Sequence, residues 1–148
     1  MNRLLLCVGL LVFLLVLVGA FLAARRFLKR YRASCMDEME GHDFEYYCAE
    51  LLRKQGFLDV EVTKGSGDFG IDILAEKDGI TYAVQCKCYT APVGVSAVQE
   101  VYAGKDYYDR MVAAVMTNQY FTEPAVKAAK KLKVLLWDRG YLEELLEE

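Results

Sequence analysis

Histidine is almost absent from this chain: His42 is the only one among 148 residues. A metal centre built from several histidines is therefore excluded. Cysteine is present but lacks a metal-binding pattern, since the five residues are an odd number and only one residue separates Cys86 from Cys88. No second pair completes a zinc site. We expect reduced, mostly buried thiols.

Charged residues are absent from a long run near the start of the chain. Residues 4–24 contain no charged, Asn, Gln or Pro residue. At about 1.5 Å of rise per residue, a helix of this length spans the roughly 30 Å hydrocarbon core of a bilayer. Acidic residues are absent up to residue 35, whereas six basic residues occur there. We expect a transmembrane anchor over residues 1–25, a basic juxtamembrane stalk over 26–36 and a folded domain over 37–148.

The basic residues orient this anchor. Five of them follow the apolar run, and only Arg3 and the α-amino group precede it. By the positive-inside rule, the amino terminus lies outside a bacterial-type inner membrane and the domain lies in the cytoplasm. A cleaved signal peptide is the competing interpretation, but its positive charge would precede the apolar run. A transporter or channel is disfavoured, because one charge-free helix offers no pathway.

The remainder of the chain is acidic. Without the six basic residues that occur up to residue 35, it has twelve basic and twenty-one acidic residues, a net charge of −9. Nonspecific affinity for DNA comes mainly from basic side chains that neutralise phosphates, so this balance opposes tight DNA binding. The aromatic residues are scattered at spacings typical of a core, and the sequence does not predict a stacking platform.

Hydrophobic periodicity predicts nine elements after the stalk, in the order α-β-β-β-α-β-α-β-α. This order indicates a mixed central sheet flanked by helices, in one α/β domain. Asp43 is the expected N-cap of the first helix, which Gly56 ends, and Pro124 lies in the first turn of a later helix. The expected strands cover residues 57–63, 69–77, 80–89, 111–117 and 134–137, and the expected helices cover 44–56, 95–108, 123–133 and 141–148.

The second and third strands form the most specific local pattern. Asp78-Gly79 lies between two apolar runs and is typical of a two-residue type I′ hairpin turn. Counting back from this turn places Asp72 opposite Gln85 on one face of the sheet, with Lys87 on the same face opposite Gly70. The same register places Ile71 and Phe69 on the other, apolar face with Ile73, Val84, Cys86 and Cys88.

A carboxylate, a carboxamide oxygen and an ammonium group on one face suit phosphodiester hydrolysis. Asp72 and Gln85 offer oxygen ligands for a hard divalent cation, and Lys87 offers a positive charge near the reacting phosphate. A surface ion pair between Asp72 and Lys87, worth under about 1 kcal/mol, is the alternative interpretation.

Three runs resemble, in this order, the Mrr-type restriction endonuclease domain of the PD-(D/E)xK nucleases: GHDFEYYCAELLRKQGF, GSGDFGIDILAEKDGITYAVQCKCY and GVSAVQEVYAGK. The similarity covers residues 36 to about 137. It implies a restriction-endonuclease-like fold, Mg²⁺ dependence and DNA as substrate, in several members modified DNA. It also implies catalytic roles for Asp72, Gln85, Lys87 and Glu45, of which Asp72, Gln85 and Glu45 bind the metal.

Further residues and one further function stay open. Asp68, in the loop before the hairpin, is an alternative metal ligand to Asp72. Gln99, on the helix after the hairpin, and Lys64, in the glycine loop, are candidate DNA contacts, although both also suit an ordinary surface. A homodimer is one alternative assembly. The alternative function is a catalytically silent, membrane-tethered nucleic-acid-binding or assembly module on the same fold, which the acidic domain favours and the intact Asp72, Gln85 and Lys87 set disfavours.

Overall fold

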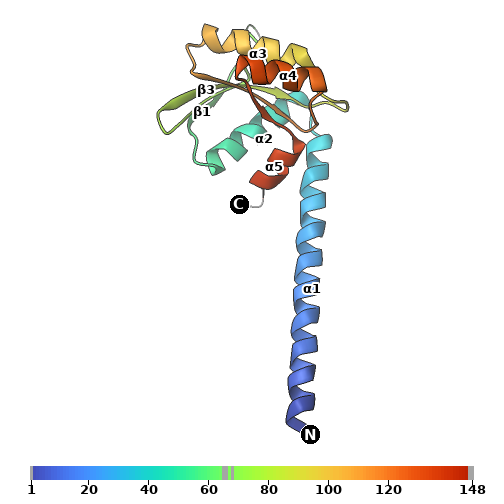
Figure 1. The fold of residues 1–148 in the computed structure, drawn as a ribbon. Helices are drawn as coiled ribbons and strands as arrows, with labels where there is room; N and C mark the ends of the chain where they lie inside the picture. The colour runs from blue at the N-terminus through green and yellow to red at the C-terminus, as the bar shows by residue number, and fades with distance from the viewer. Residues whose placement is uncertain (1, 65–66, 68, 147–148) are drawn as a thin grey trace. The chain divides into compact units, whose positions relative to one another are not determined.

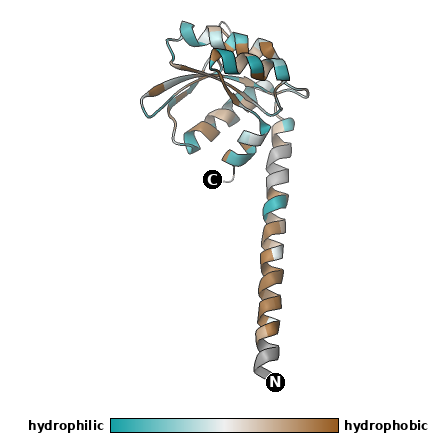
Figure 2. Cartoon of the chain, in the orientation of Figure 1, coloured by the Kyte–Doolittle hydropathy of each residue, from teal (hydrophilic) through white to brown (hydrophobic). Residues whose placement is uncertain are grey.

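The computed structural model describes residues 2–64, 67 and 69–146, and the chain divides into two units, Met1–Ser34 and Cys35–Glu148. The first unit belongs to helix α1 (Asn2–Asp37). Within this helix, the segment Cys7–Leu28 is long and apolar enough to cross a membrane, and none of it is buried. Figure 2 shows this apolar stretch of the helix.

The second unit has the nine elements in the order that the sequence predicts, so this expectation is confirmed. They are α2 (Gly41–Lys54), β1 (Leu58–Val62), β2 (Ile73–Lys77), β3 (Ile80–Lys87), α3 (Val95–Tyr107), β4 (Val112–Thr117), α4 (Glu123–Leu132), β5 (Leu135–Trp137) and α5 (Arg139–Leu145). The strands follow one another in the sheet in chain order. Strands β1 to β3 are antiparallel, and β3 to β5 are parallel.

Helices cover both faces of this mixed sheet. Helices α3 and α4 lie on one face and α2 and α5 on the other (Figure 1). The face under α3 and α4 carries an apolar cluster that includes Ile71, Ala83 and Val115 from the sheet side and Val98 and Val101 from α3. Side chains of adjacent residues on a strand point to opposite faces, so Gln85, two residues after Ala83, points toward α3.

The β2–β3 hairpin forms as expected. Asp78 and Gly79 both have positive φ, 54° and 76°, as a type I′ turn requires. Lys77 pairs with Ile80, and the register continues without a shift as far as Ile73 and Val84.

The cap of α2 differs from the expectation. Glu40 is the N-cap residue, and Asp43 lies within the first turn. The prediction that Asp43 caps this helix is wrong, because the helix begins at Gly41, three residues earlier than the apolar periodicity indicates. An acid in the first turn still interacts favourably with the helix dipole.

A polar network joins the start of the domain to its end. The Arg139 guanidinium donates two hydrogen bonds to the carboxylate of Asp37, at 2.7 and 3.0 Å, and one to the Asn118 carbonyl oxygen at 3.0 Å. The hydrogen bond from Arg139 holds the pKa of Asp37 below its ordinary value, although burial opposes this shift. Asn118 is buried and also exchanges two hydrogen bonds with the backbone of Tyr89. These contacts fix the region where β3 and β4 end.

Candidate active site

Gln85 and Lys87 of β3 meet a single partner on helix α3. The Gln85 Nε2 atom donates a hydrogen bond of 2.7 Å to Oε2 of Glu100. Lys87 Nζ donates to the same oxygen at 3.2 Å and forms an ion pair with it. The three side chains therefore form one connected group on the face of the sheet that α3 covers.

Glu100 is held in its charged form. Burial alone would raise the pKa of Glu100, but the hydrogen bond from Gln85 and the charge and hydrogen bond of Lys87 outweigh it, so the pKa lies below its ordinary value. Glu100 is thus a carboxylate at neutral pH, and it can anchor both a neutral amide and an ammonium group.

The other end of the Gln85 carboxamide is unusual. Gln85 is 1% exposed, and its Oε1 atom is buried without a hydrogen-bond partner. Exchanging the amide nitrogen and oxygen would not remove the problem, since it would press an oxygen against the Glu100 carboxylate. A buried acceptor without a partner costs about 1–3 kcal/mol, so such an atom in a folded protein points to a ligand or a role.

Gly70 makes room for this carboxamide. Its φ of +74° is one that L side chains rarely adopt, and a Cβ there would lie 3.0 Å from Gln85 Nε2 and 3.3 Å from Cβ of Glu100. The conformation therefore favours glycine strongly, and the space for a side chain is tight. The expectation that Gly70 lies opposite Lys87 is wrong: Gly70 packs against Gln85 and Glu100.

Asp72 departs from the regular hairpin register. Its backbone N–H donates to the Val84 carbonyl at 2.9 Å, although Val84 is the partner of Ile73. Two residues thus face one, which is the arrangement of a β-bulge. The Asp72 carboxylate accepts a hydrogen bond of 2.6 Å from the backbone N–H of Cys86. The carboxylate therefore lies at β3, but the expected direct pairing with Gln85 does not form.

Ile71 also differs from the register argument. It belongs to the apolar cluster under α3, the face of Ala83, and not to the face of Ile73 and Val84 where the alternation places it. Phe69 is exposed and stacks on α3. The positive φ values of Phe69 and Gly70, 51° and 74°, turn the chain just before Ile71 and end the alternation there.

Glu45 approaches the site from the opposite face, on helix α2. Its carboxylate is 2.8 Å from Nδ1 of His42, and its side chain is 19% exposed. Burial raises the pKa of the Cys86 thiol well above its ordinary value, and interactions with Cys48 and with the carboxylates of Asp72 and Glu45 raise it further. Asp72 and Glu45 therefore act electrostatically on Cys86.

The expected site residues therefore form two groups on neighbouring positions of β3. Gln85 and Lys87 face α3, whereas Asp72 and Glu45 lie near Cys86. Within the described ranges, no group of three or more His, Cys, Asp or Glu side chains could hold a metal ion. Among the described residues, the Gln85 carboxamide is a further side chain that could add an oxygen ligand to these carboxylates.

Three further candidates contribute less. Lys64 and Gln99 are exposed, as suits either a DNA contact or an ordinary surface. Asp68 lies outside the residues that the structure describes. Glu100 is the site residue that the sequence pattern does not single out. A rotation of about 100° per residue separates it from Gln99, and only the packing of α3 on the sheet decides which side chain meets β3.

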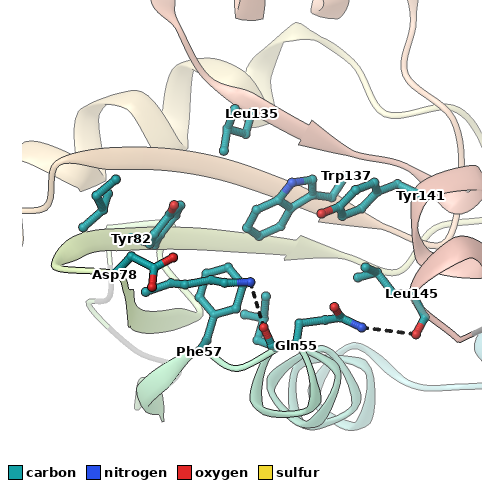
Figure 3. Close-up of a pocket in the computed structure, with 11 residues that line it drawn as sticks. Gln55, Phe57, Asp78, Tyr82, Leu135, Trp137, Tyr141 and Leu145 are labelled. Atoms are coloured by element: carbon teal, nitrogen blue, oxygen red, sulfur yellow. Dashed lines mark hydrogen bonds between the residues drawn. The ribbon is translucent and has the colours of Figure 1, made fainter. Parts of the chain in front are cut away.

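A separate cavity of about 340 Å³ lies on the other side of the sheet, near the hairpin turn. Figure 3 shows aromatic side chains from four segments around it: Phe57, Tyr82, Trp137 and Tyr141. Lys77 lies over the Phe57 ring and donates a hydrogen bond of 2.8 Å to the Gln55 carbonyl. No residue of the candidate site lines this cavity.

The sequence matches a known family over most of its length. A family model described as Mrr_cat, restriction endonuclease, matches residues 36–146. The chain belongs to this restriction endonuclease family. The resemblance to Mrr-type domains is thereby confirmed, and the family is one of nucleases of restriction type. No curated protein matches the sequence.

Three solved structures have a similar fold. A protein of unknown function, AF1548, has 27% identity and a TM-score of 0.63, with 73% of this chain and 66% of that chain covered. The DNA modification-dependent restriction endonuclease AspBHI has 18% identity and a TM-score of 0.61, with 80% and 34% covered. The MspJI restriction endonuclease in complex with a 27-mer oligonucleotide has 19% identity and a TM-score of 0.56, with 84% and 30% covered. The chain spans about two thirds of the first protein's length and about one third of the other two. The expected restriction-endonuclease-like fold is confirmed.

Proposed function

We propose that this protein is a metal-dependent DNA endonuclease of the restriction type, anchored in the cell membrane with its domain in the cytoplasm. One observation carries the catalytic part: a buried Gln85 presents an oxygen without a partner, while Glu100 holds both its amide nitrogen and the ammonium group of Lys87. Membership of a restriction endonuclease family gives this arrangement a reaction.

Asp72, whose carboxylate lies at the backbone of β3 between the two groups, would hold the divalent cation, with the Gln85 oxygen as a ligand from one side and Glu45 assisting from the other. Carboxylate and carboxamide oxygens are ligands that Mg²⁺ accepts, and the orphaned Gln85 oxygen is a donor in need of a partner. When bound, the cation polarises a phosphoryl oxygen and lowers the pKa of a bound water. A carboxamide in place of a third carboxylate leaves the set with less negative charge, so we expect metal affinity to be modest.

Lys87 would act on the phosphate itself. Lys87 follows Gln85 by two positions on β3, so both side chains point to the same face of the sheet. The ion pair with Glu100 holds the Lys87 ammonium group on this face. A preorganised positive charge stabilises negative charge that develops on the phosphate oxygens in the transition state. Glu100 also offsets the charge of Lys87 in the absence of DNA.

The substrate is proposed to be foreign or modified DNA. AspBHI is modification-dependent, and MspJI is a restriction endonuclease seen with an oligonucleotide. This chain covers about a third of the length of each, so the DNA preference of those proteins supports the proposal only in general terms.

The membrane part of the proposal rests on Cys7–Leu28 and on the basic residues that follow it. Cys35 is exposed and lies near the end of the basic stalk, on the side of the folded domain. A membrane-impermeant maleimide should label Cys35 only after intact cells are broken open. Labelling in intact cells would place the domain outside and contradict the orientation.

The catalytic part is tested by cleavage. The full chain in detergent should cut at least one member of a panel of unmodified, methylated, branched and single-stranded DNA when Mg²⁺ or Mn²⁺ is present, and none in EDTA. Lys87→Met should abolish cleavage, and a change at the remote Lys131 should not. Cleavage that persists in EDTA would contradict metal dependence.

The second candidate is a catalytically silent, membrane-tethered module, which the net charge of −9 over the domain favours. Binding of metal or DNA by the full chain, without cleavage of any member of the panel, would favour this function.

A further inference from the structure

An exposed pair of aromatic rings lies beside the candidate active site. Phe69 and Tyr107 stack with ring centroids 3.8 Å apart and an angle of 30° between the ring planes. Both remain solvent-accessible, at 56% and 59% exposure. Two rings that stack on each other and stay this exposed are not a part of the core.

The backbone under Phe69 is held in an unfavourable conformation. Five residues other than glycine have positive φ in the described part of the chain. Three are aspartates, which tolerate this region, and Lys133 closes helix α4. Phe69, with φ of +51°, is the bulky exception. Such strain persists only where the surroundings impose it, and it concentrates at functional sites.

Helix α3 is the part of the structure that holds Phe69 in this backbone conformation. A Cβ on Gly104 would lie 2.5 Å from the Phe69 carbonyl oxygen and 2.7 Å from Ile71, so the absence of a side chain lets this segment approach the helix. Glu100, Gly104 and Tyr107 are four and three residues apart and share one side of α3. On this side, Glu100 contacts Gln85 and Lys87, Gly104 contacts the backbone of Phe69, and Tyr107 stacks on the Phe69 ring. The aromatic pair is thus built into the same surface as the candidate site.

We propose that Phe69 and Tyr107 form a stacking platform for an unpaired DNA base next to the phosphate that is cut. This inference rests on the proposed function for its partner. Each ring uses one face on the other, and the Tyr107 ring also meets the Tyr108 ring edge-on at a centroid distance of 5.1 Å. More than half of each side chain is still exposed to a base, and stacking on aromatic rings is a common source of single-strand affinity. A domain with a net charge of −9 needs such a source, because it lacks the basic surplus that supplies affinity elsewhere.

The chemistry also specifies the form of the DNA. A base inside a duplex has both faces covered by its neighbours, so only its edges are accessible. A base that stacks on Phe69 and Tyr107 must be unpaired, as in a single strand, a gap or a base turned out of the helix. We therefore expect tighter binding to single-stranded or gapped DNA than to an intact duplex.

The test uses the full chain in detergent and a labelled single-stranded oligonucleotide that contains 2-aminopurine, in EDTA so that no cleavage occurs. Phe69→Leu and Tyr107→Leu keep apolar bulk but remove the aromatic face. Each should weaken binding about 10-fold and reduce the quenching of 2-aminopurine. Tyr107→Phe should retain both the binding affinity and the quenching, because it keeps the aromatic ring. Tyr102→Leu is the matched control, because Tyr102 is a partly exposed tyrosine on the same helix with Lys105 over its ring; it should bind within twofold of the parent.

Several results would overturn the proposal. They are an absence of DNA binding by the parent chain, leucine variants that bind like the parent, and equal losses in Tyr102→Leu. Leucine variants that bind DNA normally but change the oligomeric state would assign the pair to a contact between copies of the chain. Since binding is measured without metal, a parent that binds through this pair but never cleaves DNA would contradict the proposed nuclease function and leave Phe69 and Tyr107 as a base-stacking site alone.

Discussion

Gly104→Ala is the change whose effect the structure specifies most closely. The added Cβ would lie 2.5 Å from the Phe69 carbonyl oxygen and 2.7 and 2.8 Å from two carbons of Ile71. Real Cβ atoms essentially never approach other atoms so closely, so backbone must move. Overpacking of this kind costs about 1–3 kcal/mol. Alanine favours a helix over glycine by up to about 1 kcal/mol, which offsets part of the cost.

We therefore expect Gly104→Ala to lower the free energy of unfolding by roughly 1–2 kcal/mol, which is several degrees in the midpoint of thermal unfolding. Gly41→Ala is the matched control, since Gly41 is also helical but has no atom within 4 Å of the added Cβ. Its midpoint should stay level or rise slightly. Circular dichroism of the full chain in detergent measures both. A Gly104→Ala protein that melts at or above Gly41→Ala would refute the close packing of residues 69–71 on α3.

Three further changes test other contacts. Glu100→Gln keeps an acceptor for Gln85 but loses the ion pair with Lys87, and should lower the rate of DNA cleavage about 10-fold, or about 1.4 kcal/mol, in a plasmid nicking assay; an unchanged rate would mean that Glu100 does not position the site. Arg139→Met should lower the free energy of unfolding by about 1–2 kcal/mol, allowing for the solvent exposure of Asp37. Because the pKa of Asp37 is lowered in the fold, the contribution of the Asp37 contact is present above the unfolded pKa of about 3.9 and is lost as the pH falls through the lower folded pKa. The difference between parent and variant should therefore shrink in acid, toward what the hydrogen bond to Asn118 contributes; a difference that is constant with pH would contradict the Asp37 contact. Cys86, whose pKa is raised, should resist alkylation in the folded protein at pH 8 while the exposed Cys35 reacts, and mass spectrometry of the two peptides would detect the opposite order.

The β2–β3 hairpin could be predicted because its causes are local. Asp78-Gly79 specifies the turn, and the turn specifies which residues pair. The same counting fails before Ile73, because Gly70 adopts positive φ and Asp72 forms a bulge. A glycine permits such a turn but does not require it. The alternation of side chains in the sequence therefore does not predict that Ile71 lies on the other face.

The partners of Gln85 and Lys87 depend on contacts between distant segments. Glu100 differs from Gln99 only by one step of a helix, and the packing of α3 on the sheet decides between them. The aromatic residues show the same limit. Their spacing along the chain is typical of a core, and the sequence therefore does not indicate a platform, yet the fold brings Phe69 and Tyr107 together from segments 38 residues apart and leaves both exposed.

The central claim is that Asp72 and the Gln85–Lys87 pair form a metal-dependent nuclease site. The most direct measurement is the rate of plasmid nicking by the full chain at a fixed Mg²⁺ concentration, for the parent and for Asp72→Ala. The proposed site predicts nicking by the parent and a loss of at least about 100-fold in Asp72→Ala, as expected when a metal-binding carboxylate is removed. Equal nicking by both proteins, each still folded, would contradict it.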